Sequence, residues 1–249
     1  MATLALGLDV GGSSIKHAPV DVASGALQAD LASVPTPQPA TVQALCNALI
    51  GLAETTPAGT AVGVALPSVI LHGVIQTAAN LDDSLLGFDA GRELSARLRR
   101  PVALLNDADA AGLAEAHFGA ARGVRGAVMM LTFGTGIGSA LILDGRLWPN
   151  SELGHMEVDG AEGEQRAAAR IRSEEGLSWR QWSTRVNRYL DAINRLFWPE
   201  LIVVGGGVTE NWTQFAPLLQ SRAPLKPAAL GPAAGVVGAA LAAAGHAAA

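Results

Sequence analysis

Two short segments of this sequence place glycines and hydroxyl residues between apolar stretches. The first is LGLDVGGSSIK, residues 6–16, and the second is LTFGTGIGSAL, residues 131–141. Glycine has no Cβ, so the backbone N–H groups of such a turn can come close to an anion. Each segment could therefore bind phosphate, although an ordinary hairpin turn that needs glycine for a positive φ explains each one equally well.

Neither segment has the pattern of the common nucleotide loops. A P-loop needs Gly-Lys-Ser/Thr at the start of a helix, and a dinucleotide-binding turn also opens a helix. Asp9 ends the apolar stretch before the first turn, where a carboxylate could hold a metal-bound water beside phosphate or simply cap the turn. Lys16 follows the same turn and suits either a phosphate contact or a solvated position at a strand end.

The sequence NDAD, residues 106–109, follows the apolar stretch VALL. In α/β proteins, ligands bind near the carboxyl ends of strands, and Asp107 at this position could accept a proton from an attacking hydroxyl. The alternative is that Asn106 or Asp107 caps the helix that follows. Both interpretations can hold, since one of the two residues suffices as a cap.

Two further segments carry polar or glycine-rich signals. ELGH, residues 152–155, places Glu152 and His155 around a glycine, an arrangement that suits vicinal hydroxyls of a sugar or a solvated loop. A zinc site there is not indicated, since the pattern HExxH is missing and Cys46 is the one cysteine of the chain. GGG, residues 205–207, would let a flat ligand pass close to the backbone, or would simply form a tight turn after a strand.

Composition limits the partners of this chain. Its 249 residues carry a net charge of -5, so no global field attracts polyanions, and an anion site must be local. The N-terminus has no basic segment before its apolar residues, and the uncharged stretch from residue 227 to 249 is rich in Ala, Gly and Pro. We therefore expect a cytoplasmic protein with no signal peptide, no membrane span and no nucleic-acid partner.

The elements that must position these motifs alternate between strands and helices. Hydrophobic periodicity and turn residues predict strands at about 4–9, 14–22, 26–34, 61–67, 69–77, 101–107, 126–132, 138–143 and 201–208. The same signals predict helices at about 41–54, 89–98, 108–119, 178–198, 211–220 and 233–244, and leave 160–176 as loop or short helix. A strand–glycine turn–strand unit occurs once in each half, which indicates two related α/β domains around a cleft.

The expected domains are residues 1–107, a smaller N-terminal α/β domain, and residues 108–232, a larger C-terminal one. A C-terminal helix at about 233–246 is placed so that it can pack back on the first domain. The tryptophan-rich helix at 178–198 suits either core packing or an interface between two copies of the chain.

Taken together and in this order, the motifs resemble the ROK family of sugar kinases. The resemblance covers nearly the whole chain through LGLDVGGSSIK, ANLD, LLNDADAAGLAE, LTFGTGIGSAL, ELGHMEVDG, LIVVGGGV and AAGVVGAAL. It implies the actin-like, ribonuclease H-like ATPase fold, and the sequence is most similar to the polyphosphate glucokinase branch of the family. The implied reaction transfers a phosphoryl group from polyphosphate, or from ATP, to the 6-hydroxyl of glucose.

The resemblance also implies roles for individual residues. Asp107 would be the general base. The sugar would be held by Asn80, Asn106, Asp107, Glu152, His155 and Glu164. The phosphates would meet Asp9, Gly11, Gly12, Ser13 and Lys16 on one side and Thr135, Gly136 and Gly138 on the other, with Asp9 holding Mg²⁺ through water. Gly205, Gly206 and Gly207 would lie on the adenosine side when ATP is the donor, and domain closure would exclude water.

Departures from the family pattern bear on metal and donor. The cysteine-rich segment that binds zinc in many members is here DGAEGEQRAAARI, without cysteine, so no zinc is expected. Arg166, Arg170 and Arg172 could extend a polyphosphate track or lie on a solvated helix. The alternatives are a strictly ATP-dependent hexokinase for glucose or mannose, and a non-catalytic sugar-binding or regulatory protein. A homodimer is expected, because the family commonly forms dimers.

Overall fold

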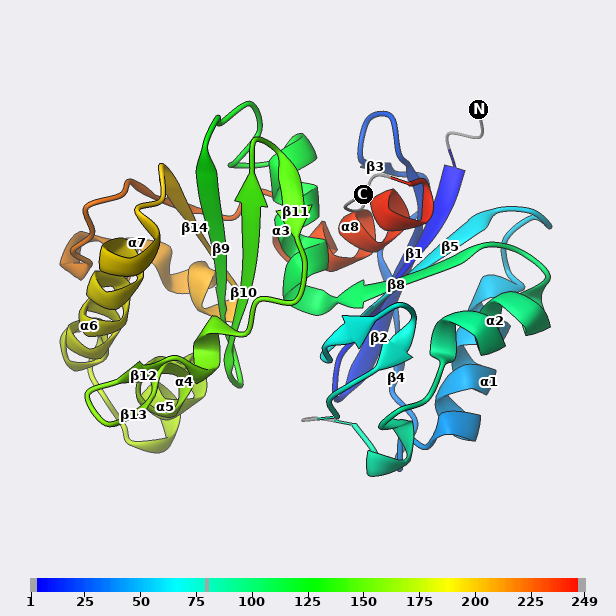
Figure 1. The fold of residues 1–249 in the computed structure, drawn as a ribbon, viewed down its shortest axis with the longest axis horizontal. Helices are drawn as coiled ribbons and strands as arrows, with labels where there is room; N and C mark the ends of the chain where they lie inside the picture. The colour runs from blue at the N-terminus through cyan, green and yellow to red at the C-terminus, as the bar shows by residue number, and fades with distance from the viewer. Residues whose placement is uncertain (1–3, 79–80, 246–249) are drawn as a thin grey trace. The chain divides into compact units, whose positions relative to one another are not determined.

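The computed structural model describes residues 4–78 and 81–245 and divides the chain into two compact units (Figure 1). Unit 1 contains Met1–Ala114 and Ala233–Ala249, and unit 2 contains Glu115–Pro232. The division falls inside helix α3, Asp107–Phe118, and not before it. The first turns of α3 belong to unit 1 because Gly238 of the C-terminal helix packs directly on the carbonyl group of Ala110.

Unit 1 is built on a mixed sheet with the order β3-β2-β1-β5-β8, in which β4 also pairs with β2. The central strands β1, β5 and β8 are parallel, and β2 returns antiparallel to β1. The strands are β1 Leu4–Val10, β2 Ser14–Asp21, β3 Ala26–Leu27, β4 Ala32–Pro35, β5 Ala61–Leu66 and β8 Val102–Asn106. The carboxyl ends of β1 and β8 therefore carry Asp9 and Asn106 to the same edge of this sheet.

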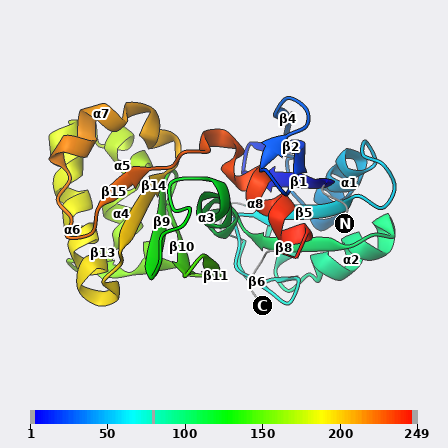
Figure 2. The same cartoon turned by 90° about the horizontal axis from the view of Figure 1, so that it is seen from above.

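Helices cover both faces of this sheet. Helices α1, Val42–Ala53, and α2, Ala90–Leu98, lie on one face, while α8, Ala234–Ala243, lies on the other (Figures 1 and 2). Helix α8 approaches β1 and β5 so closely that a Cβ on Gly63 would collide with the carbonyl group of Ala239. None of the described helices has the length and the apolar character that crossing a membrane demands.

Unit 2 repeats the same arrangement of strands. Its sheet has the order β11-β10-β9-β14-β15, with an antiparallel hairpin of β9 and β10 beside the parallel strands β14 and β15. The strands are β9 Ala127–Phe133, β10 Ile137–Leu143, β11 Arg146–Trp148, β14 Leu201–Gly205 and β15 Leu225–Pro227. The duplicated strand–glycine turn–strand unit that the sequence predicts is therefore present, once at the β1–β2 turn and once at the β9–β10 turn.

One long amphipathic helix packs on the sheet of unit 2 and contributes its largest buried side chains to the core. Helix α6, Trp179–Phe197, begins at Ser178, which forms a reciprocal capping box with Gln181. Its buried face places Trp182 and Tyr189 edge-on to Phe133 of β9. Both aromatic rings belong to the core, whereas Trp198, just after the helix, is 64% exposed.

Short elements complete both units. In unit 1 they are β6 Ile70–Leu71, β7 Val74–Ile75 and the 3-10 helix η1 Asp83–Leu85. In unit 2 they are η2 Leu153–His155, β12 Glu157–Val158, β13 Ala161–Glu162, α4 Gly163–Ala167, α5 Ala169–Glu174, η3 Gly207–Asn211, α7 Trp212–Phe215, η4 Ala216–Leu218 and η5 Gly231–Ala233. Helices α4 and α5 lie in the segment that the sequence left as loop or short helix.

Three expected elements are shorter than predicted. The strand expected at 26–34 is two strands, because β3 and β4 pair with different parts of β2. The strand expected at 69–77 folds into the β6–β7 hairpin, with His72 and Gly73 at positive φ. The helix expected at 211–220 breaks into short pieces, since Pro217 has no N–H and cannot continue a helix.

Candidate active site in two halves

The first glycine turn joins β1 to β2 and is held by the segment that follows β4. The Thr36 hydroxyl donates to the Gly11 carbonyl at 2.6 Å, and the Gln38 amide donates to the Gly12 carbonyl at 2.9 Å. The Thr36 N–H donates to the Ser13 carbonyl at 3.1 Å. All three carbonyl groups are thus fixed, while the N–H groups of Gly12 and Ser13 have no protein partner among the described residues.

The glycines of this turn do not have positive φ. Neither Gly11 nor Gly12 has the left-handed conformation, and the same is true of Gly134 and Gly136 in the second turn. The alternative explanation of both turns, a hairpin that needs glycine for positive φ, is therefore wrong. A Cβ on Gly134 would meet nothing within 4 Å. The missing side chain therefore leaves the backbone of this turn open to a ligand.

Asp9 lies next to the first turn and pairs in register with Lys16 across β1 and β2. The Lys16 Nζ lies 3.6 Å from Oδ2 of Asp9, whose side chain is 17% exposed. Burial raises the pKa of the Asp9 carboxyl, and the charge of Lys16 lowers it. Gly235 of α8 packs against this carboxylate, where a Cβ would lie 2.7 Å from Oδ2.

Asp107 follows β8 directly and starts helix α3. The Asn106 Oδ1 accepts the N–H groups of Ala108 at 2.8 Å and Asp109 at 3.2 Å, which is the pattern of a helix cap. Its Nδ2 donates to the Ser68 carbonyl at 3.3 Å. Asn106 therefore caps the helix and is 7% exposed, while Asp107 Oδ1 accepts the Ala108 N–H at 2.7 Å.

The second glycine turn joins β9 to β10 in unit 2. The Gly134 N–H closes the turn by donating to the Gly136 carbonyl at 3.0 Å, and the Gly134 carbonyl accepts the Arg170 N–H of α5 at 3.0 Å. The N–H groups of Thr135 and Gly136 have no protein partner within the described part of the chain. Gly138 lies beyond the turn, in β10, opposite Thr132.

Glu164 connects this turn to the ELGH segment. Its Oε2 accepts the Ile137 N–H at 3.2 Å, and a Cβ on Gly136 would lie 2.5 Å from the same oxygen. His155 Nε2 lies 3.7 Å from Glu152 Oε2. Burial raises the pKa of the Glu152 carboxyl, His155 lowers it and Glu164 raises it. Three sugar-binding residues predicted from sequence, Glu152, His155 and Glu164, are thus brought together in unit 2.

Glu162 also belongs to this group, and the sequence analysis missed it. Its Oε2 lies 3.4 Å from His155 Nδ1 across the β12–β13 hairpin. His155, Glu162 and Glu164 each bring one potential ligand atom within 4.8 Å of the others, so in the described part of the chain they could hold a metal ion. The expectation that no zinc binds stays a prediction. The repeated Glu in GAEGE was the available sequence signal for Glu162.

The remaining predicted positions have local structural explanations or lie elsewhere. Gly206 has a φ of +85°, and a Cβ there would lie 2.3 Å from the Phe133 carbonyl oxygen, so the turn after β14 requires glycine. Gly205 ends β14 and Gly207 starts η3. Asn80 lies outside the described residues.

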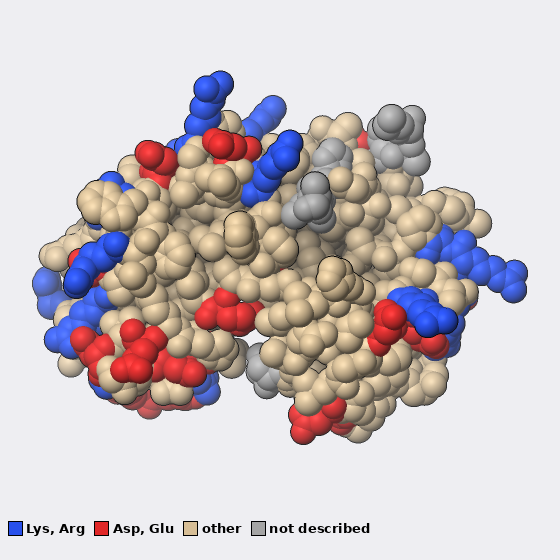
Figure 3. All heavy atoms as spheres, in the orientation of Figure 1, with Lys and Arg blue, Asp and Glu red and all other residues tan. Residues whose placement is uncertain are grey.

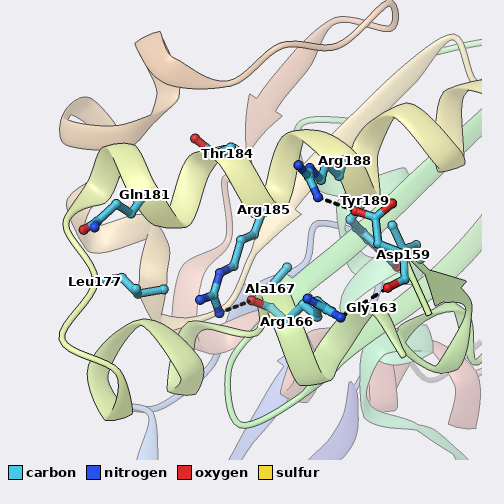
Figure 4. A pocket seen from close by; sticks show the side chains of 11 residues that line it. Asp159, Gly163, Arg166, Ala167, Leu177, Gln181, Thr184, Arg185, Arg188 and Tyr189 are labelled. Atoms are coloured by element: carbon cyan, nitrogen blue, oxygen red, sulfur yellow. Dashed lines mark hydrogen bonds and ion pairs between the residues drawn. The ribbon is translucent and has the colours of Figure 1, made fainter. Parts of the chain in front are cut away.

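The three arginines considered for a polyphosphate track have different surroundings. The Arg172 guanidinium stacks on the Trp179 ring at 3.6 Å from its centroid. The Arg170 backbone N–H donates to the Gly134 carbonyl of the second turn, and its side-chain Nε lies 3.9 Å from Oε1 of Glu174. Arg166 points into a separate cavity of unit 2, beside Asp159 (Figure 4).

Comparison with known proteins identifies the family of this chain. The model of the ROK family matches residues 5–169, and the chain belongs to that family. A polyphosphate glucokinase of Mycobacterium tuberculosis is 45% identical over 95% of this chain and 89% of its own length. The crystal structure of an inorganic polyphosphate/ATP-glucomannokinase from Arthrobacter sp. strain KM is 46% identical, covers 97% of this chain and 98% of its own, and superposes with a TM-score of 0.91.

More distant members share the fold. The structure of a ROK family glucokinase from Streptomyces griseus, in complex with glucose and AMPPNP, covers 95% of this chain and 98% of its own with a TM-score of 0.79 at 23% identity. The two α/β units, each with a hairpin beside parallel strands, are the actin-like ATPase fold of the ROK sugar kinases.

Proposed function

We propose that this ROK-family chain transfers the terminal phosphoryl group of inorganic polyphosphate to the 6-hydroxyl of glucose. The observation that carries the proposal is identity of 45–46% along almost the whole chain with a polyphosphate glucokinase and a polyphosphate/ATP-glucomannokinase. The site chemistry agrees with this class of reaction, since it combines two open backbone turns with a strand-end carboxylate and a carboxylate–imidazole group.

Asp107 is the proposed general base. Its carboxylate would accept the proton of the attacking hydroxyl as that oxygen bonds to the transferred phosphorus. Asn106, which caps α3 through its own oxygen, holds the start of the helix and with it the backbone of Asp107. The Asp107 carboxylate also accepts the Ala108 N–H, so it adds to the cap that Asn106 provides.

The glucose hydroxyls would be bound by residues from both units. Unit 1 contributes Asn106 and Asp107, and Asn80 belongs to the same proposal. Unit 2 contributes Glu152, His155 and Glu164, which already contact or face one another. Carboxylates accept hydrogen bonds from hydroxyl groups, and such charge-assisted bonds are stronger than neutral ones.

The phosphate chain would be bound by the two glycine turns. Gly11, Gly12, Ser13 and Lys16 would act in unit 1, and Thr135, Gly136 and Gly138 in unit 2. Supporting this, both turns leave two N–H groups without a protein partner in the described chain. Preorganised N–H dipoles stabilise the charge that spreads over the transferring phosphoryl group without reorganising.

Asp9 is the proposed anchor for Mg²⁺. Its carboxylate is mostly buried, and the described ion pairs give it a single cationic partner, Lys16, so a further cation nearby would offset the cost of desolvating the charge. One carboxylate suits Mg²⁺, which keeps several waters when it binds phosphates. The ion would bridge phosphate oxygens and neutralise their charge.

A second donor and a second acceptor follow from one of the relatives. The Arthrobacter protein is a polyphosphate/ATP-glucomannokinase and is 46% identical to this chain. We therefore include ATP as a donor, with Gly205–Gly207 on its adenosine side, and mannose as an acceptor.

A homodimer is also proposed, with unit 2 as the contact. Trp148 is 69% exposed and Trp198 64% exposed, and Leu143 and Leu196 are exposed as well. Large exposed apolar side chains of this kind favour burial against a partner. Sedimentation equilibrium of the full chain tests this: a monomer at micromolar concentration contradicts it.

One set of assays tests the proposed reaction. Purified protein is incubated with glucose or mannose and with ATP or long-chain polyphosphate, each with and without Mg²⁺, and sugar 6-phosphate is measured. We expect glucose 6-phosphate from polyphosphate, and loss of product when Mg²⁺ is chelated. Product from ATP alone contradicts the polyphosphate assignment, and no product with any pair favours a non-catalytic sugar-binding protein.

A further inference from the structure

Unit 2 contains a cavity of about 360 Å³ to which the proposed reaction gives no role. It lies between helix α4, the turn after β12 and the N-terminal half of helix α6 (Figure 4). The lining residues are Val158, Asp159, Gly163, Arg166, Ala167, Leu177, Gln181, Thr184, Arg185, Arg188 and Tyr189. The volume is within the usual range of small-molecule sites.

The charged lining of this arginine cavity is mostly positive. Three guanidinium groups, those of Arg166, Arg185 and Arg188, face one carboxylate, that of Asp159. Two of the three have an acidic partner: Arg188 Nη1 lies 2.6 Å from Asp159 Oδ2, and Arg185 forms a bidentate pair with Glu175, outside the lining. Even with Glu175 included, one positive charge remains.

Arg166 supplies that remaining charge. Among the described residues it has no carboxylate within ion-pair distance, and its Nη2 donates to the Asp159 carbonyl at 3.2 Å. Figure 4 shows Arg166 and Arg188 both reaching Asp159, while Arg185 reaches the Arg166 carbonyl. Two of the guanidinium groups, those of Arg166 and Arg188, thus lie beside Asp159, and the third lies beside the Arg166 backbone.

The positive excess is confined to the cavity lining and is not part of a basic surface. The chain has a net charge of -5, and at the lower left of Figure 3, over unit 2, acidic side chains gather with basic ones at their edges. A small polyanion is therefore attracted by this cluster itself and not by a broad basic surface. Guanidinium groups match the oxygens of a phosphoryl group through paired N–H bonds, which a halide cannot use.

We propose that the arginine cavity binds a phosphoryl group, separately from the two glycine turns. Val158, Ala167, Leu177 and the ring of Tyr189 give the cavity apolar walls, which leave room for the organic body of a phosphomonoester. The phosphoryl group could belong to a sugar phosphate, such as the product of the proposed reaction, or to a short polyphosphate. The two sources share the same recognition chemistry and are separated by the experiment below.

The wall of the cavity adjoins residues of the proposed sugar site. Gly163 lines the cavity, and the next residue, Glu164, accepts the Ile137 N–H. Tyr189 packs on Gly163 so closely that a Cβ there would lie 2.6 Å from its ring, and its hydroxyl donates to the Leu153 carbonyl at 3.1 Å. A phosphoryl group bound by Arg166 would therefore contact helix α4, the short helix that also carries Glu164.

The proposal is tested by NMR of the arginine side chains themselves. In the full-length ¹⁵N-labelled protein, the Nε–Hε signals of Arg166, Arg185 and Arg188 are monitored by NMR while inorganic phosphate, tripolyphosphate or glucose 6-phosphate is added at constant ionic strength. We expect saturable shifts of these signals with at least one of the three probes. Strongest binding by glucose 6-phosphate identifies a sugar phosphate as the source, and strongest binding by tripolyphosphate identifies a phosphate chain.

Two variants separate this site from the glycine turns. Arg166→Gln is expected to raise about tenfold the dissociation constant measured from the Arg185 and Arg188 signals, which corresponds to the loss of one charged hydrogen bond. The shifts of the Thr135 and Gly136 amides should be unchanged. Arg180→Gln is the matched control, since Arg180 is exposed on α6, the helix of Arg185 and Arg188, and does not line the cavity. Arg166→Lys, which keeps the charge, serves if the glutamine variant does not fold.

The proposal is overturned if the three arginine signals do not shift saturably with any probe, or if Arg166→Gln and Arg166→Lys bind as tightly as the unaltered protein. Shifts confined to the Thr135 and Gly136 amides also overturn it while supporting the proposed donor site. Arginine shifts without any response of those amides support the cavity and count against the donor site.

Discussion

The two glycine turns look alike in sequence but are held in different ways. The Gly11–Ser13 turn is fixed by side chains of a later loop, since Thr36 and Gln38 bind its carbonyl groups. The Gly134–Gly136 turn is fixed by the Arg170 N–H and by Glu164, a residue that also faces the proposed sugar ligands. The first turn is therefore supported independently of the residues of the proposed sugar site, and the second is supported by one of them.

The largest expected effect on activity comes from replacing the proposed general base, a change that leaves both glycine turns intact. Asp107→Asn should lower kcat by roughly 10²- to 10⁴-fold, the usual contribution of a general base, because the amide cannot accept the proton. The helix start should persist, since Asn106 caps it. Steady-state rates with polyphosphate and glucose measure the effect, with circular dichroism as the check on folding. Full activity in this variant removes Asp107 from the mechanism.

Glu164 gives the next largest effect and tests the coupling of the second turn. Glu164→Ala should raise the KM for glucose and for the donor together, each by about tenfold, since one charged hydrogen bond is worth about 1.5–3 kcal/mol. Glu164→Gln keeps an oxygen that can accept the Ile137 N–H. It should restore the donor KM and leave the glucose KM raised. If the donor KM never changes, the turn does not depend on Glu164.

Thr36→Val tests the contrasting support of the first turn. The loss of one hydroxyl bond to the Gly11 carbonyl should raise the donor KM by about fivefold, the effect of roughly 1 kcal/mol, and leave the glucose KM unchanged. Thr55→Val is a matched control, because its hydroxyl binds the Leu52 carbonyl at the end of α1. A rise in the glucose KM for Thr36→Val contradicts the proposed independence of this turn.

The smallest expected effect concerns stability next to the first turn. Because burial raises the pKa of Asp9 in the folded state, ionisation of this group favours the unfolded state once the pH exceeds the unfolded value. Asp9→Asn should therefore raise the Tm at neutral pH, measured without Mg²⁺ or substrates. The gain should shrink as the pH falls toward the ordinary range of an aspartic acid. A lower Tm at neutral pH indicates that the ion pair with Lys16 outweighs the cost of burial.

Much of the fold follows from patterns that are local in the sequence. The apolar runs of β1 and β9, the apolar face of α6 and the cap at Ser178 each depend on residues within a few positions of one another. Strand ends and glycine turns could likewise be located, so Asp9, Asp107 and both turns were found. Asn106 and Asp107 could not be divided between cap and base, since that depends on where each side-chain oxygen points.

The supports of the site were beyond sequence reasoning for a different reason. Thr36 and Gln38 act on a turn more than twenty residues earlier in the chain, and Glu162 reaches His155 only because the β12–β13 hairpin folds back. No local pattern distinguishes these residues from other polar residues in loops. The two explanations of each glycine turn could not be separated from the sequence, because φ is set by the closed hairpin.

The position of Gly235 has a consequence for the order in which the protein is made. Asp9 lies on β1, which is synthesised more than two hundred residues before the helix that packs against its carboxylate, residues 234–243. Unit 2 is continuous in the chain and can fold during synthesis, whereas unit 1 is complete only once helix α8 has been made. A nascent chain that lacks this helix has the Gly11–Ser13 turn but leaves one face of the sheet beside it uncovered, so unit 1 is completed only after the residues of unit 2 have been made.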